Sequence, residues 1–242
     1  VMVLSIIAMS GLTAPTASAA ASAGDLIKME GLSSVYYLGD DGKRYVFPNE
    51  STYFSWFADF SSVVTISATE LQSYPLGGNV VMRPGTTLVK ITTDPSVYAV
   101  EPNGVLRKIQ SEAQATALYG TNWNKRIVDL ADSFFTNYTI GAPLADGQIP
   151  AGSLVKNAGS STVYYWDGTN YRSIASEAAM AANRLWMKYV MTVTNTLTAS
   201  GNALTGMETA LVRVNQGAST GPVVTGSGLM VSLNSGTAAG TT

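Results

Sequence analysis

The chain has 242 residues, a formal net charge of −2 and only 12% charged residues. It contains no cysteine and no histidine, which excludes disulfides, thiolate nucleophiles and the imidazole base of a Ser or Cys triad, and removes the commonest zinc ligand. No cluster of Lys and Arg stands out that would follow a phosphate backbone, so nucleic-acid binding is not expected.

The first 23 residues have the pattern of an export signal. Residues 1–9 are an apolar run, and small residues follow it up to two Ala-Ser-Ala patterns, at residues 17–19 and 21–23. The run is about half as long as a membrane-spanning helix, and no basic region precedes it. We therefore expect residues 1–23 to be a signal peptide that is truncated at its N-terminus and is cut after Ala19 or Ala23. The alternative is a retained helix that packs in an assembly.

Residues 24–47 predict a short strand followed by a β-hairpin. Residues 26–28 are the short strand, and residues 35–38 and 43–47 are the two hairpin strands. Asp41-Gly42 lies between the hairpin strands and supplies the positive φ of a tight turn.

Residues 48–84 predict two helices separated by a strand. Pro48 ends the hairpin, and Asn49 or Ser51 caps a helix rich in aromatic residues. A β-type run occupies residues 63–66. Ser67, with Glu70 three residues later, then predicts a capping box and a short helix.

The same order of features recurs twice, in residues 85–151 and 152–201. Several residue types return at matching distances; the corresponding lysines, like the corresponding tyrosines, are 62 and 66 residues apart. Such agreement is typical of internal repetition. We call the following the marker residues: Lys28, Lys90 and Lys156; Tyr36, Tyr98 and Tyr164; Arg44, Arg107 and Arg172; Glu50, Glu112 and Glu177. A glycine follows the later strand of each copy, at Gly77, Gly141 and Gly201.

The predicted fold is therefore α+β, with three tandem repeats of about 60 residues, residues 24–84, 85–151 and 152–201. Each repeat has a short strand, a β-hairpin, a helix, a strand and a short helix. The repeats are expected to form a compact pseudo-threefold or a linear array.

The composition changes after residue 201. Residues 202–214 place apolar residues at helical spacing, which predicts one helix. Residues 216–228 have the composition of a linker, so residues 202–228 are interpreted as helix and linker. Residues 229–242 begin with strand-like alternation and are interpreted as the truncated start of a β-sandwich-like domain.

The marker residues permit a structural and a functional interpretation. The lysines either snorkel at strand ends or line a basic strip for an anionic glycan. The arginines either pair with the helix-opening Glu of their own repeat, or stack on the repeated Tyr, or meet an external ligand. The structural interpretation is the simpler one, so we expect these residues to hold each repeat together.

The acidic residues form no recognisable metal or catalytic motif. Asp40-Asp41-Gly42 and Asp167-Gly168 lack the alternating acids of a calcium loop, which favours hairpin turns. A carboxylate pair for glycoside hydrolysis would come from four acids of which no two are singled out by spacing, Asp59, Glu70, Asp129 and Asp132. We expect no catalytic, metal-binding or cofactor-binding residue, no cofactor, and no enzyme.

The aromatic residues are the candidates for contact with a glycan. Trp56, Trp123 and Trp186 recur in or just after the helix of each repeat, which favours core filling. Trp166, on a hairpin, is the best candidate for exposure, and Tyr165 and Tyr37 are the other possible glycan contacts. Two sequons, at Asn49 and Asn137, permit glycosylation only in a host with that machinery.

Three phrases carry a resemblance to a family: VYYLGDDGKRYVFPNESTYFSWF, PLGGNVVMRPGTTLVKITTDPSVYAV and NWNKRIVDLADSFFTNYTIG. They resemble repeat modules of large secreted bacterial cell-surface proteins of S-layer-like type, and they are similar to "LVK…VYY…GKR" modules that accompany cell-wall hydrolases. The resemblance covers residues 24–201. It implies a secreted, cell-surface or envelope location and Ig-like domains further along the chain, but it brings no catalytic residues with it.

Together these features predict an exported, non-enzymatic structural component of the cell envelope that self-associates in a surface layer. The alternative is a cell-wall glycan-binding module that targets a larger wall-associated enzyme.

Overall fold

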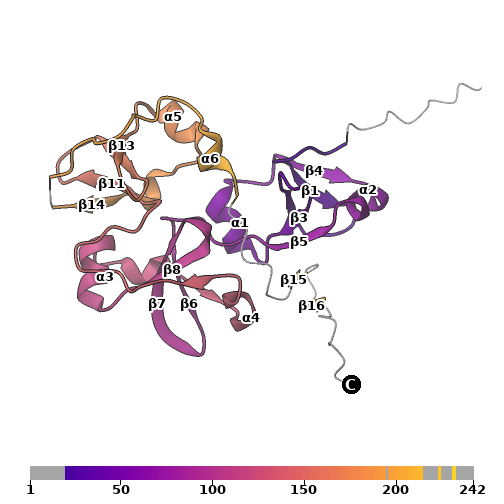
Figure 1. Cartoon of the computed structure of the whole chain (residues 1–242), viewed down its shortest axis with the longest axis horizontal. Coiled ribbons are helices and arrows are strands. Elements are labelled where there is room, and N and C mark those ends of the chain that lie inside the picture. The colour runs from indigo at the N-terminus through magenta and orange to yellow at the C-terminus, as the bar shows by residue number, and fades with distance from the viewer. Residues whose placement is uncertain (1–19, 195, 215–222, 225–230, 233–242) are drawn as a thin grey trace, which may run out of the picture.

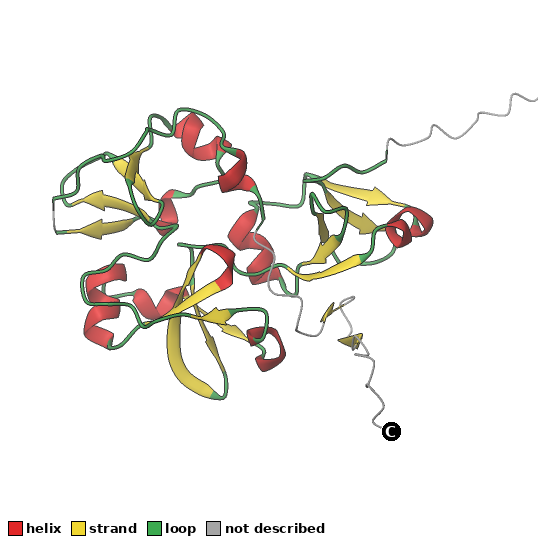
Figure 2. Ribbon diagram, in the orientation of Figure 1, coloured by secondary structure: helices red, strands yellow, loops and turns green. Residues whose placement is uncertain are grey.

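The structure, a computed structural model, describes residues 20–194 and 196–214 and two short strands at residues 223–224 and 231–232. Residues 1–19 of the expected signal peptide lie outside the described residues, as do most of the expected linker and of the expected further β domain. The fold is of mixed α and β type, with three mixed sheets and short helices (Figures 1 and 2).

The first sheet is an antiparallel meander flanked by two parallel strands. Its elements are β1 (Leu26–Met29), β2 (Tyr36–Leu38), β3 (Arg44–Val46), α1 (Glu50–Trp56), β4 (Val63–Ile66), α2 (Ala68–Ser73) and β5 (Leu76–Asn79). The strand order is β4-β1-β2-β3-β5, in which β4 runs parallel to β1 and β5 parallel to β3. Parallel neighbours require crossovers, and α1 and α2 lie in them.

The second sheet has the order β10-β8-β7-β6-β9. Its strands are β6 (Leu88–Ile91), β7 (Asp94–Glu101), β8 (Val105–Lys108), β9 (Ile127–Leu130) and β10 (Thr139–Ile140). Its helices are η1 (Pro102–Gly104), α3 (Glu112–Tyr119), η2 (Trp123–Arg126) and α4 (Asp132–Phe135). Again the meander β6-β7-β8 is flanked by parallel partners, β9 beside β6 and β10 beside β8.

The third sheet has the order β13-β12-β11-β14. Its elements are β11 (Leu154–Asn157), β12 (Val163–Trp166), β13 (Tyr171–Ser173), α5 (Glu177–Ala182), η3 (Met187–Tyr189) and β14 (Met191–Val193). β14 runs parallel to β11, and a single parallel bridge from Ile174 to Leu204 stands where the other sheets have a fifth strand.

The expectation of one helix over residues 202–214 is wrong. Only α6 (Thr209–Val212) is helical there. Leu204, which is completely buried, instead donates its backbone N–H to Ser173 O at 2.8 Å and accepts from Ala175 N at 3.0 Å. The open edge of the third sheet gives Leu204 hydrogen-bond partners for its backbone, and these bonds outweigh the tendency of the apolar spacing toward a helix. Beyond them, β15 (Val223–Val224) pairs antiparallel with β16 (Val231–Ser232).

The three helices that follow the meanders are each capped by the side chain of the residue just before them. Asn49 Oδ1 accepts from Thr52 N at 2.8 Å, which confirms Asn49 as the cap of α1. Ser111 and Ser176 accept in the same way from the backbone three residues later, each at 3.1 Å. These bonds satisfy N–H groups that the helix leaves without partners, and they place a Glu at the first position of α1, α3 and α5.

The capping box at the start of α2 is confirmed in one half only. Ser67 Oγ accepts from Glu70 N at 3.1 Å. The Glu70 carboxylate, however, accepts from Ala21 N at 2.9 Å, and Tyr74 donates its hydroxyl to Ala21 O at 3.1 Å. Residue 21 of the expected signal peptide therefore packs on the first sheet, beside Tyr74.

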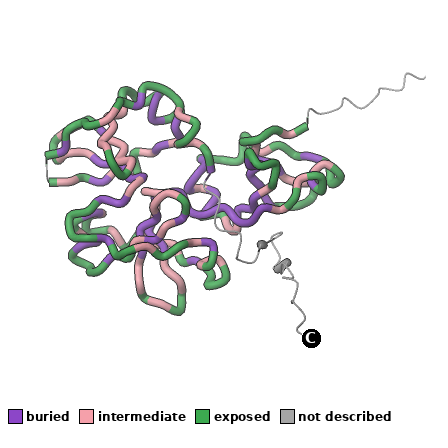
Figure 3. Tube along the Cα trace, in the orientation of Figure 1, coloured by how far each residue is buried: buried purple, intermediate pink, exposed green. Residues whose placement is uncertain are grey.

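The three sheets gather around a common centre rather than along a line (Figure 1). At this centre Arg83 is only 5% exposed and lies between the rings of Trp56 and Trp186, at 5.1 and 5.6 Å. Its guanidinium donates to three backbone carbonyls of residues 152–214, which we call the third region, as residues 24–84 are the first: Arg184 O at 2.5 Å, Asn183 O at 2.8 Å and Leu211 O at 3.1 Å. Arg83, which follows the last strand of the first sheet, therefore connects the first region to the third. In Figure 3 the buried segments lie mostly toward this centre.

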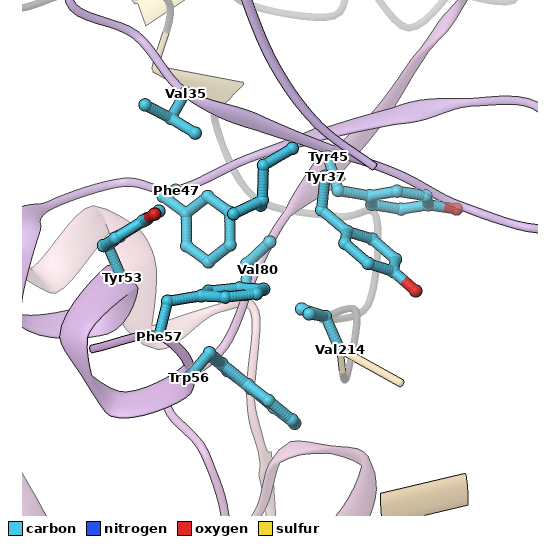
Figure 4. Close-up of a cluster of buried hydrophobic side chains, with 10 residues drawn as sticks. Val35, Tyr37, Tyr45, Phe47, Tyr53, Trp56, Phe57, Val80 and Val214 are labelled. Atoms are coloured by element: carbon cyan, nitrogen blue, oxygen red, sulfur yellow. The ribbon is translucent and has the colours of Figure 1, made fainter. Parts of the chain in front are cut away.

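The core of the first sheet also receives the last described residue of the main body. Val214 is 2% exposed and packs among the rings of Tyr37, Trp56 and their neighbours (Figure 4). Trp56 donates its indole N–H to Val81 O at 2.8 Å, so this ring fills the core as expected, whereas Trp123 and Trp186, of which the same was expected, are half-buried. Residue 214 therefore returns the chain to the sheet from which it started.

Candidate functional site

The marker lysines and tyrosines occupy matching places in the three sheets. Each lysine is the third residue of the first meander strand and is half-buried. Each tyrosine pairs with the second residue of that strand, as Tyr36 does with Ile27. Lys90 forms an ion pair with Asp129 at 2.7 Å. These lysines and tyrosines take part in the strand pairing of three separate sheets, and they do not come together in one site.

The marker arginines do not form one set. The pairing of β2 with β3 places Tyr45 opposite Tyr37, whereas Arg107 is opposite Ala99 and Arg172 opposite Tyr165. The position equivalent to Arg107 and Arg172 is therefore held by Tyr45, and Arg44 lies one residue earlier, on the other face.

The glycines that follow the later strands, Gly77, Gly141 and Gly201, agree with this register. A Cβ on Gly77 would lie 2.4 Å from the Tyr45 ring, and one on Gly141 would lie 3.3 Å from Arg107 Cδ. A Cβ on Gly201 would likewise lie 3.2 Å from Arg172 Cγ. Each glycine thus makes room for the same third-strand side chain.

The expected ion pairs between the arginines and the helix-opening glutamates are wrong. Arg107 pairs with Glu101 at 3.0 Å, and Arg172 pairs with Glu208 at 2.5 Å. Hydrogen bonds from Arg172 hold the pKa of Glu208 below its usual value. Arg44 stacks over Tyr36 at 5.4 Å, which confirms for this arginine the alternative of stacking on the repeated Tyr, and it donates to Leu71 O and Tyr74 O. The strand register places Arg107 and Arg172 beside Glu101 and Glu208, and not beside the glutamates at the helix starts.

The three predicted glycan contacts do not form a joint platform. Tyr37 is 4% exposed and belongs to the core of the first sheet, so it is unavailable to a ligand. Tyr165 and Trp166 are adjacent on β12, and their side chains therefore enter different clusters on opposite faces. Trp166 is half-buried and stacks on Tyr171 at 4.4 Å.

The helix-opening glutamates, by contrast, all line grooves, and each groove lies at the same place relative to its sheet. Glu50 lines a groove of about 400 Å³, Glu112 one of about 290 Å³ and Glu177 one of about 830 Å³. We call these the first, second and third grooves, after the sheets. All three glutamates are exposed.

Corresponding residues line the three grooves. Each has two residues just ahead of the marker tyrosine, a hydroxyl and then a valine: Ser34 and Val35, Ser96 and Val97, Thr162 and Val163. Each also has the helix cap and an aromatic ring that follows the helix: Asn49 with Phe60, Ser111 with Trp123, Ser176 with Trp186. The structural equivalent of Trp123 and Trp186 is therefore Phe60, and Trp56 is a separate core residue.

The third groove is the largest because the first sheet supplies part of its wall. Phe57, Asp59 and Ser62 line it opposite Glu177 and Trp186. Asp59 Oδ1 accepts from Ser61 N at 2.8 Å and from the Ser61 hydroxyl at 2.5 Å, and these bonds lower the pKa of the Asp59 carboxyl. Asp59 is therefore ionised at neutral pH, when it accepts hydrogen bonds and cannot act as a general acid.

The first groove contains a buried hydroxyl. Ser34 is 8% exposed, and within the described part of the chain its Oγ has no hydrogen-bond partner. The Oγ atom is itself shielded from solvent, so it costs free energy as a buried polar atom without a partner and is not offered to a ligand in the groove.

The four acids considered for hydrolysis lie apart. Asp59 is at the third groove and Glu70 on α2. Asp129 pairs with Lys90, and Asp132 accepts from the Thr93 hydroxyl at 2.9 Å. Among the described residues no group of three or more acidic side chains gathers where a metal ion would bind.

The two sequons differ in access. Asn137 is 2% exposed, which leaves no room for a glycan on the folded chain, while Asn49 serves as the cap of α1.

The grooves were not predicted, although the sequence carries a signal for them. The hydroxyl and the valine precede each marker tyrosine by two residues and one residue, and the ring follows each helix-opening glutamate by nine to eleven residues. The pattern was not recognised because Trp56, and not Phe60, was aligned with Trp123 and Trp186.

Comparison with known proteins gives no further indication: no protein-family model matches the chain, and no curated protein matches it significantly. Within residues 20–194 and 196–214, no helix has both the length and the apolar character needed to cross a membrane.

Proposed function

We propose that this chain is an exported, non-enzymatic envelope protein that binds glycans through three copies of one α+β unit, residues 24–84, 85–151 and 152–201. The observation that carries the proposal is the recurrence of the same groove, with an aromatic ring, a hydroxyl and a carboxylate, on all three sheets. The shared strand connections and the matching places of the marker lysines and tyrosines support the three-copy organisation.

The combination of side chains suits a saccharide. A sugar ring presents C–H groups on one face, which pack on an aromatic ring, and hydroxyls at its edge, which bond to carboxylates and hydroxyls. A glutamate in every groove disfavours strongly anionic polymers, because like charges repel. Neutral and amino-bearing glycans are therefore the proposed ligands.

Three grooves on one chain imply avidity. A polymer that engages two grooves is held far more tightly than an oligosaccharide that engages one. This valency fits a protein that anchors to an extended wall glycan.

The test is co-sedimentation of the full chain with purified cell-wall polysaccharide, with Trp123→Ala and Trp186→Ala as the groove variants. We expect each variant to reduce binding severalfold, and the double variant, which keeps only the first groove, to reduce it much further. Ile140→Ala is the matched control, because Ile140 is 59% exposed and lines none of the three grooves. Unchanged binding of a folded double variant would contradict the proposal.

A structural surface-layer role remains the second candidate. Its support is the low charge together with exposed apolar side chains on separate elements, such as Val64 on β4 and Ile140 on β10. Both strands lie at sheet edges, where further strands can add. Ordered assembly of the purified chain without glycan would favour this second role.

A further inference from the structure

We infer that the third groove is the principal saccharide site and that a bound saccharide fastens the third sheet to the first. The inference rests on the proposed glycan-binding function, and it concerns which groove dominates and what its occupation does to the fold.

The first step is the composition of the groove. Residues of the first region, Phe57, Asp59 and Ser62, face residues of the third, Glu177 and Trp186, across about 830 Å³. The first and second grooves are about half that size or less and are lined from one sheet each. A saccharide in the third groove therefore gains two walls of contact, including carboxylates on both sides.

The second step concerns what else holds the two walls together. Arg83 of the first region donates to backbone carbonyls of the third, among them Arg184 O at 2.5 Å. Arg184, whose φ of 53° is unusual for a residue with a side chain, lies over the Phe57 ring at 4.6 Å. Arg213 and Asp40 add an exposed ion pair at 2.5 Å, which contributes little to stability. Arg184 itself lines the groove, so a bound saccharide adds its contacts to a junction that these residues already form.

The third step is thermodynamic linkage. A ligand that touches both walls binds the closed arrangement and loses half its contacts if the sheets separate. It must therefore shift the equilibrium toward closure by its differential affinity. A ligand in the second groove touches one sheet only and exerts no such effect.

The experiment uses soluble glycan-strand fragments from purified bacterial cell wall as the probe. The variants are Asp59→Asn on the first wall and Glu177→Gln on the third, with Glu112→Gln in the second groove for comparison. Glu30→Gln is the matched control, because Glu30 lines none of the three grooves. All four side chains are exposed, so the fold should tolerate these changes. Losing a charged hydrogen-bond partner should weaken binding about tenfold for Asp59→Asn and Glu177→Gln. Glu112→Gln should weaken it less, and Glu30→Gln should leave it unchanged.

Closure is measured separately. Because the chain has no cysteine, Leu32→Cys and Met207→Cys provide unique sites for a pair of spin labels on the first and third regions; these residues are 44% and 65% exposed. We expect the probe to narrow the distribution of distances between the labels, and Glu177→Gln to prevent the narrowing.

The outcomes separate the two ideas. Failure of the unmodified chain to bind the probe would overturn the proposed function. Binding that is lost in Glu112→Gln but kept in Asp59→Asn and Glu177→Gln would overturn this inference and leave the function standing. Binding at the third groove with an unchanged distance distribution would overturn the fastening role.

Discussion

Replacement of Arg83 by methionine tests whether this guanidinium closes the molecule. Arg83 donates to three carbonyls of the third region, Asn183 O, Arg184 O and Leu211 O. A buried carbonyl that loses its donor costs about 1–3 kcal/mol, so three of them cost about 3–9 kcal/mol.

Part of that cost is offset because burial of the charge is itself unfavourable. Desolvation lowers the pKa of Arg83 from 12.5 to about 10, which at about 1.4 kcal/mol per pKa unit corresponds to about 3 kcal/mol. Methionine packs well between Trp56 and Trp186 and removes this penalty. We therefore expect Arg83→Met to lower the free energy of unfolding by about 3 kcal/mol.

The assay is urea denaturation, combined with hydrogen exchange at the amides of residues 183–185. Arg213→Met is the matched control, since Arg213 makes an exposed ion pair and its loss should cost less than about 1 kcal/mol. Arg83→Lys should fall close to Arg83→Met, because one ammonium cannot reproduce the guanidinium's fork of bonds. A loss below about 1 kcal/mol for Arg83→Met, with exchange unchanged, would refute the assignment of closure to this side chain.

Two further predictions concern a close approach and an ion pair. Gly85→Ala should destabilise the chain by about 2 kcal/mol or more in the same denaturation assay, because Gly85 has a φ of 69° and a Cβ there would lie 2.2 Å from Gly152 O. Gly159→Ala is the control: Gly159 has a φ of 74° but no atom within 4 Å of an added Cβ, so this variant should show only the smaller backbone cost. Equal losses of stability in the two variants would contradict the steric argument. Arg172 lowers the pKa of Glu208 below 4.5. The contribution of this ion pair to stability is therefore complete above pH 4.5 and is lost as the pH falls through the pKa that Glu208 has in the folded chain. In thermal unfolding, Glu208→Gln should show a smaller fall in Tm between pH 5 and pH 3 than the unmodified chain, and identical pH profiles would refute the linkage.

Local chemistry was predictable from the sequence. The Asp-Gly turn, the cap at Asn49 and the start of three helices at a glutamate depend on neighbouring residues, and the structure confirms the cap and these helix starts. The spacing of lysines and tyrosines also identified positions that are equivalent in the strand pairing. Short-range rules hold here because the caps and turns bond within three or four residues.

What sequence reasoning could not supply was strand register and long-range closure. Alignment of arginines by residue type grouped Arg44 with Arg107, whereas the pairing puts Tyr45 in that place. Leu204 and Val214 have helical spacing, yet one completes a sheet edge and the other enters a core some 180 residues earlier in the chain. The helix-opening glutamates were interpreted as structural partners of the arginines, and only the fold shows that they line grooves.

The return of Val214 to the first sheet fixes how the chain responds to pulling. Gly24 N donates to Leu38 O at 2.7 Å, and Val214 packs beside Tyr37 in the same core. A force applied between residues 24 and 214 therefore loads the first sheet alone. The second and third sheets lie in the chain between these two points, but the force is not transmitted through them until Val214 is pulled out of the core of the first sheet. A chain under load would thus keep two of its three sheets at rest.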